Sequence, residues 1–178
     1  MAERLGFRYV DEEVVARAAE KGGVDLELVQ DSEQRKSRLR RLIEEYARTG
    51  VAHAPSEQPP KTEEHRALIR DVVAELGEQG DAVIVAHAAS HALAGREGIL
   101  RVLVTASPEA RARRLAADGA GDAEKRIRDG DAARADYLER FYAVDHELPT
   151  HYDLVVNTGT LAPEQAADLI VRAAELRV

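Results

Sequence analysis

The stretch Ala82-Val83-Ile84-Val85-Ala86 decides the fold class of this 178-residue chain. It is short, continuously apolar and rich in β-branched residues, as is typical of a strand covered on both faces. Two further apolar runs, Ile99 to Ala106 and Asp153 to Asn157, have the same character. The helical patterns that separate or follow these runs are Pro108 to Ala117, Ala123 to Tyr142 and Pro163 to Leu176. Because strands that alternate with helices need crossover connections, the sequence predicts an α/β fold: a parallel sheet with helices on both faces.

The N-terminal half adds one strand and two helices to this prediction. Phe7-Arg8-Tyr9-Val10 indicates a strand, and a helix begins near Asp11, a suitable N-cap, and ends at Gly22-Gly23. Residues 25–60 are highly charged, with an amphipathic stripe in the middle and a proline-rich loop at the end. Residues 63–78 predict a second helix. The apolar residues on its buried face are Leu68, Ile69, Val72, Val73 and Leu76.

Composition limits the classes of function. The net charge is -8, which argues against broad nucleic-acid binding, since that needs a basic surface. The absence of cysteine excludes disulfides, thiolate catalysis and zinc sites with Cys ligands. No run approaches the roughly 18 apolar residues of a membrane span, and the N-terminal residues do not have the pattern of a signal peptide. We therefore expect a cytoplasmic protein without a membrane or nucleic-acid partner.

Five segments follow one another in an order and spacing that match a known family. They are Leu5–Asp11, Val83–Ala89, Val102–Arg111, Lys125–Tyr137 and Tyr152–Thr158. Together they resemble the cytidylate-kinase-like family of nucleoside monophosphate kinases, which have the P-loop NTPase fold. By this resemblance, Leu5–Asp11 is the second strand, and Val83–Ala89 is an apolar strand that in the family ends in Gly-Arg-Gly-Ala. Val102–Arg111 is the next strand with the start of a helix. Lys125–Tyr137 is the arginine-bearing lid, and Tyr152–Thr158 is the last strand.

The resemblance implies a single domain over residues 1–178. Within it, a helical region for binding the nucleoside monophosphate would lie at about 25–60 and a lid at about 118–145. The implied activity is transfer of a phosphoryl group from ATP, with Mg²⁺, to a pyrimidine nucleoside monophosphate such as CMP. The implied cofactors are thus ATP and Mg²⁺, and no metal ligand is assigned to the protein.

Two departures from the family pattern bear on this activity. The family begins with a strand and a glycine-rich P-loop that cradles phosphates, whereas Met1 falls near the end of the helix after that loop. The expected fold therefore lacks the first strand and the P-loop. The Gly-Arg-Gly-Ala motif reads Ala86-His87-Ala88-Ala89, and a neutral imidazole cannot make the bidentate contact of a guanidinium. Transfer is expected to be impaired, and the alternative is an inactive pseudokinase that binds a nucleotide or a protein.

The resemblance also assigns roles to individual residues. Arg128 and Arg134 match the lid arginines that neutralise charge in phosphoryl transfer; the alternative is a solvated helix with ion pairs such as Glu124 with Arg128. Asp11 and His87 match substrate-binding positions. For Asp11 the structural alternative is a helix N-cap.

Other polar residues also have both a functional and a structural interpretation. Asn157 matches a position that lies near the nucleotide base in the family. The structural alternative is that Asn157 starts a turn. His87 and His91 are four residues apart, but no third metal ligand is evident, so packing or surface roles are favoured. Arg111, Arg113 and Arg114 follow Pro108 on a predicted helix and indicate a solvated face.

A missing central strand would leave a gap between Val83–Ala86 and Leu100–Thr105, with several unpaired backbone groups on each side. Each such group costs on the order of 1–3 kcal/mol when it is buried. We therefore expect the two strands to close up and pair directly in parallel. The less favoured alternative is a homodimer in which a second copy supplies the strand.

Overall fold

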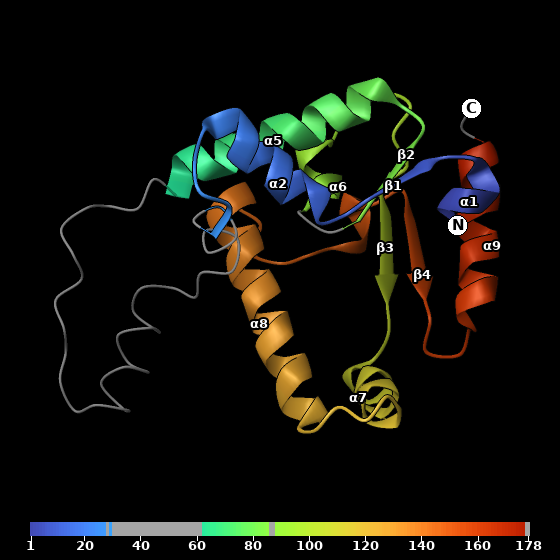
Figure 1. Cartoon of the computed structure of the whole chain (residues 1–178). Coiled ribbons are helices and arrows are strands. Elements are labelled where there is room, and N and C mark those ends of the chain that lie inside the picture. Colours follow the sequence, from blue (N-terminus) through green and yellow to red (C-terminus); the bar gives the residue numbers. More distant parts are fainter. Residues whose placement is uncertain (28, 30–61, 86–87, 177–178) are drawn as a thin grey trace, which may run out of the picture. The chain divides into compact units, whose positions relative to one another are not determined.

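The computed structural model describes residues 1–27, 29, 62–85 and 88–176, which form two compact units (Figure 1). Unit 1 comprises Met1–Asp11 with Val73–Val178, and unit 2 comprises Glu12–Val72. The elements in chain order are α1 (Ala2–Leu5), β1 (Arg8–Val10), α2 (Glu13–Gly22), α5 (Thr62–Gln79), β2 (Ala82–Ile84), α6 (Ala89–Ala92), β3 (Val102–Thr105), α7 (Pro108–Ala117), α8 (Ala123–Tyr142), the 3₁₀ turn Pro149–His151, β4 (Leu154–Asn157) and α9 (Pro163–Glu175).

The strands of unit 1 are short and pair in parallel, as the sequence predicts. β1 pairs with β2, with Tyr9 opposite Val83, and β3 pairs with β4, with Leu103 opposite Val155. These pairs form two separate two-stranded sheets among the described residues. The mixed α/β class and the parallel pairing are thus confirmed. The described strands do not form a single continuous sheet.

The expected closure of the sheet is wrong, because β2 and β3 do not pair among the described residues. That expectation assumed that the unpaired strand edges would be buried. Parts of this region are instead exposed: Val104 of β3 is 55% exposed and Val85, just after β2, is 38% exposed, while the other residues of both strands are partly buried. Backbone groups at a solvated edge can hydrogen-bond to water, so they do not carry the cost of buried unpaired groups.

One face of the β3–β4 pair is covered by α9. The core there contains Val156 of β4 with Ala166 and Ile170 of α9, and Figure 1 shows α9 running alongside β4. Partly buried side chains pack around this core: Val102, Leu154 and Leu161. The helix begins at Pro163, where the missing N–H of proline has no cost. This packing fixes the position of β4, and so of the chain that leads into it.

Unit 2 contains α2 and the first part of α5. Val14 and Ala18 of α2 and Ile69 of α5 are buried, as expected from their helical spacing. The two helices approach closely at Gly22, where an added Cβ would lie only 2.4 Å from Cδ1 of Leu68. Gly23 then ends α2 in the left-handed conformation, with a φ of 60°. Most of the predicted monophosphate-binding region, residues 25–60, lies outside the described residues.

None of the helices in the described part of the chain combines the length and the apolar character needed to cross a bilayer.

Candidate functional site

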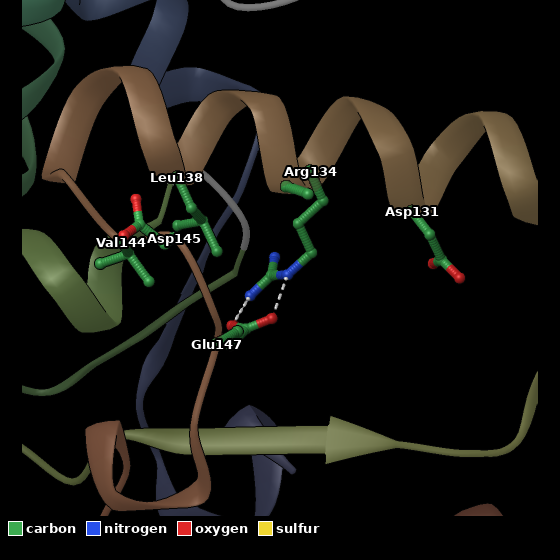
Figure 2. Close-up of a pocket in the computed structure, with 7 residues that line it drawn as sticks. Asp131, Arg134, Leu138, Val144, Asp145 and Glu147 are labelled. Carbon is green, nitrogen blue, oxygen red and sulfur yellow. Dashed lines mark hydrogen bonds and ion pairs between the residues drawn. The ribbon is translucent and has the colours of Figure 1, made fainter.

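A polar cluster in unit 1 joins α8 to the chain that leads into β4, and its centre is the ion pair of Arg134 with Glu147. Arg134 donates from Nε to Glu147 Oε2 at 2.9 Å and from Nη2 to Oε1 at 2.5 Å. Figure 2 shows this two-point contact between the helix and the loop. The hydroxyl of Tyr152 also donates to Glu147 Oε1, and it accepts from Arg134 Nη2 at 3.3 Å. Glu147 is therefore bound by two side chains from separate segments.

The local sequence explains how these groups meet. Asp131, Arg134 and Leu138 lie three or four residues apart, so they share one face of α8. The helix ends at Tyr142, and Ala143 takes the left-handed conformation with a φ of 52°. The N–H of Val144 then donates to the carbonyl of Leu138 at 3.2 Å, which reverses the chain. This reversal brings Glu147 back alongside Arg134.

Histidine and tyrosine rings border the cluster. His91, at α6, places Nε2 3.5 Å from the hydroxyl of Tyr152. The centroid of its ring lies 5.5 Å from that of Tyr142, 5.6 Å from that of His151 and 5.9 Å from that of Tyr152. These are distances at which aromatic rings interact favourably. His91 thus has a packing role next to the ion pair, the interpretation that the sequence favoured.

The electrostatic environment keeps the Arg134–Glu147 pair ionised. The hydrogen bond to Glu147 raises the pKa of Arg134, and the hydrogen bond from Arg134 lowers the pKa of Glu147. Burial, followed by the hydrogen bond to Glu147, raises the pKa of Tyr152 to about 12, so its hydroxyl remains a donor at neutral pH. Burial also lowers the pKa of His91, which favours the neutral imidazole.

A small pocket of about 150 Å³ adjoins the ion pair. Its residues come from α8 and from the loop after it: Asp131, Arg134, Ala135, Leu138, Val144, Asp145 and Glu147. The lining contains three carboxylates and one guanidinium. Two of those carboxylates already have cationic partners, since Asp131 accepts from Arg111 Nη1 at 2.6 Å and Nη2 at 2.7 Å. Arg134, paired with Glu147, is the one cationic side chain of this lining.

The two predicted lid arginines occupy different environments. Six residues on an α-helix correspond to a rotation of about 600°, so Arg128 and Arg134 point about 120° apart. Arg128 lies on the surface, with 69% of its side chain exposed, 3.8 Å from Glu124. The structural alternative, an ion pair with Glu124, is therefore present. The catalytic role of both arginines remains a prediction.

Of the two predicted substrate-binding residues, Asp11 lies in the described part of the chain. Asp11 is not the N-cap of α2, because the helix begins one residue later than expected and Glu12 holds the cap position. The carboxylate of Asp11 accepts a hydrogen bond from the hydroxyl of Tyr9 at 3.0 Å. His87 lies outside the described residues, and its role stays a prediction.

Asn157 starts a turn, as its alternative interpretation predicted. Its side-chain oxygen accepts from the N–H of Gly159 at 2.8 Å. The next residue, Thr158, is buried and accepts from Arg114 through both its hydroxyl, at 3.1 Å, and its carbonyl. A contact of Asn157 with a nucleotide base remains a prediction.

The predicted solvated face is present at Arg113 and Arg114, which are exposed, whereas Arg111 is partly buried. Arg111 joins α7 to α8 through Asp131, and Arg114 joins α7 to the end of β4 through Thr158. Both partners are distant in sequence, and for that reason the local helical pattern could not reveal them. Glu147 was missed for the same reason: no local pattern distinguishes one glutamate in a loop.

The described residues do not form a protein-only site for the implied Mg²⁺. No three of their His, Asp or Glu side chains are grouped so as to hold a metal ion. Mg²⁺ is commonly bound by one or two carboxylates together with the phosphates of a substrate. The described side chains thus do not assign a place to Mg²⁺, and no chemical step is derived through it.

Comparison with known proteins gave a family and similar solved structures. The model of the cytidylate kinase-like family matches residues 1–160. A search of curated proteins found no match. The crystal structure of an uncharacterized protein from Eubacterium ventriosum is similar, with a TM-score of 0.58 and 14% identity over 96% of this chain and 99% of that chain. At this identity the likeness concerns the fold alone.

Proposed function

Because the chain belongs to the cytidylate kinase-like family, we propose that it binds a pyrimidine nucleoside monophosphate such as CMP and that Arg134 contacts a phosphate group. In this family-based proposal, ATP with Mg²⁺ is the phosphoryl donor. We expect transfer to be weak, because Ala86-His87-Ala88 stands where the family has Gly-Arg-Gly. A histidine offers neither the permanent charge nor the two parallel donors of an arginine.

The observation that carries this proposal is the two-point contact of Arg134 with a carboxylate. Guanidinium groups bind carboxylates and phosphates through the same pair of parallel N–H donors. Arg134 presents this pair at 2.9 and 2.5 Å from the oxygens of Glu147. Its side chain is 47% exposed, so a ligand can reach it without unfolding of α8. Arg134 thus has both the geometry and the access that phosphate binding requires.

Calorimetric titration with CMP tests this proposal. We expect Arg134→Ala to weaken CMP binding by about tenfold or more, since a charge-assisted hydrogen bond contributes roughly 1.5–3 kcal/mol. Arg172→Ala is the matched control, because Arg172 lies on α9 and is 71% exposed in an ion pair with Glu175. The control should bind CMP like the unmodified chain. Equal CMP affinity of the Arg134 variant and the unmodified chain would contradict the proposed role.

A protein-interaction module is the second candidate, favoured by exposed apolar side chains on the strands. Tyr9 of β1 is 58% exposed and Val104 of β3 is 55% exposed, whereas parallel strands are usually covered on both faces. The partner to test first is a second copy of the chain. In sedimentation velocity this candidate predicts a dimer that Val104→Asp converts to a monomer. A monomer at all concentrations would contradict self-association.

A further inference from the structure

The part of the chain that supplies the partners of Arg134 is relevant to ligand binding. Glu147 and Tyr152 both precede β4, so they bind the guanidinium near the amino end of that strand. Open α/β sheets bind ligands outside the carboxyl ends of their strands. The partners of Arg134 therefore come from the chain that enters β4 at its amino end, and not from the carboxyl end, the expected ligand side.

The neighbouring turn of α8 lies nearer to the carboxyl end of β3. Asp131 is bound by Arg111 of α7, the helix that directly follows β3. Figure 2 shows Asp131 one turn along α8 from Arg134, on the same side of the helix. Long side chains on a helix lean toward its N-terminus, which for Arg134 is the side of Asp131. A released guanidinium can thus turn toward the ligand side by changing its rotamer.

We propose that Glu147 is an internal competitor: its carboxylate occupies the guanidinium of Arg134 in the ligand-free protein, and a phosphate group of the ligand must displace it. This inference rests on the proposed function, because it concerns the regulation of the same arginine. Tyr152 strengthens the competitor by donating a second hydrogen bond to the same carboxylate oxygen that accepts from Arg134 Nη2.

The tether makes this competition effective. A group held on the same chain acts at an effective concentration of about millimolar or higher for short connections. A phosphate group from solution must compete with this effective concentration of the Glu147 carboxylate before it binds Arg134. Removing the charge of Glu147, with the chain otherwise unchanged, should therefore raise ligand affinity by about tenfold, the effect of one charge-assisted hydrogen bond at a partly exposed site.

The test compares Glu147→Gln with the unmodified chain in two measurements. The first is calorimetric titration with CMP. The second is the rate at which butanedione modifies Arg134, followed by peptide mass spectrometry without added ligand, with inorganic phosphate and with CMP. Glu175→Gln is the control, because Glu175 pairs with Arg172 on α9, 3.0 Å away. Tyr152→Phe is a second variant, since it weakens the competitor while keeping the charge of Glu147.

We expect Glu147→Gln to bind CMP about tenfold more tightly, with a smaller gain for Tyr152→Phe and none for the control. Arg134 should react faster in Glu147→Gln, and inorganic phosphate should protect it. Equal CMP affinity of Glu147→Gln and the unmodified chain, or unchanged reactivity of Arg134, would overturn the competitor and leave the proposed function standing. If Arg134 reacts faster but neither CMP nor phosphate protects it, the proposed function fails, and the competitor fails with it.

Discussion

Substitution of Asp153 should reveal how the β3–β4 pair is held together. Its carboxylate accepts from the backbone N–H of Arg101 at 2.8 Å, from Nε at 3.2 Å and from Nη2 at 3.0 Å. Only 18% of the Asp153 side chain is exposed. Asp153→Ala removes a charged acceptor from a backbone donor, which costs about 1.5–3 kcal/mol. Arg101→Ala removes only the partly exposed ion pair, which contributes about 1 kcal/mol or less.

We therefore expect the free energy of unfolding to fall by about 2–3 kcal/mol in Asp153→Ala and by about 1 kcal/mol or less in Arg101→Ala. Urea denaturation at pH 7 measures both, and the double variant gives the coupling energy of the pair. Because Asp153 still accepts the backbone N–H in Arg101→Ala, the two losses should differ clearly. An Arg101→Ala loss as large as that of Asp153→Ala would refute the dominant role of the backbone donor.

Two further predictions concern stability. Gly77→Ala should lower the free energy of unfolding by about 1 kcal/mol, since the added Cβ would lie 2.9 Å from Cδ2 of the buried Leu93. Gly130→Ala, whose added Cβ would have no atom within 4 Å, should raise the free energy of unfolding by about 0.5–1 kcal/mol. Equal effects of the two substitutions in urea denaturation would refute the close contact at Gly77. The pKa of His91 lies below 6.5 because the effect of burial outweighs the attraction of Glu147. The unfolded chain therefore binds more protons than the folded chain below this pH. The free energy of unfolding should fall as the pH drops from 6.5 through the pKa of His91 in the folded state. His91→Asn should remove this part of the pH dependence of unfolding, and an unchanged profile would contradict the prediction.

The helices could be predicted from the sequence because their signals are local. The bounds of α7 match the prediction, since Pro108 fits the first turn and Ser107 caps the helix by accepting from the N–H of Ala110 at 3.2 Å. The bounds of α8 also match. α2 begins one residue later than predicted, with Glu12 rather than Asp11 in the cap position.

The pairing of strands could not be predicted in the same way. Tyr9 pairs with Val83, and Val102 pairs with Leu154, across long stretches of chain whose local patterns carry no information on order. The prediction that β2 and β3 would pair relied on the cost of buried unpaired groups. The exposure of this region could not be known from the sequence: Val104 of β3 and Val85, just after β2, are both exposed.

The candidate site was predicted in part. Arg134 was identified from the resemblance, but its partner Glu147 was not, because their contact depends on the chain reversal at Ala143. A non-glycine residue in the left-handed conformation is uncommon and cannot be read from an alanine in the sequence. The abundance of arginine, 21 of the 25 basic residues, also means that only position distinguishes one arginine from another.

The cations of unit 1 differ in how easily a ligand can displace their internal partners. Arg101 is held by Asp153 beside β4 with 22% of its side chain exposed, and Arg111 is held by Asp131 of α8 with 33% exposed. Arg134 is 47% exposed, and its partner Glu147 lies in a loop outside any helix or strand. Moving a loop carboxylate breaks no regular backbone hydrogen bonds, whereas Asp131 is fixed by its helix and Asp153 by its position next to β4. Of these three pairs, Arg134–Glu147 is the one that an incoming phosphate group can exchange at the lowest cost.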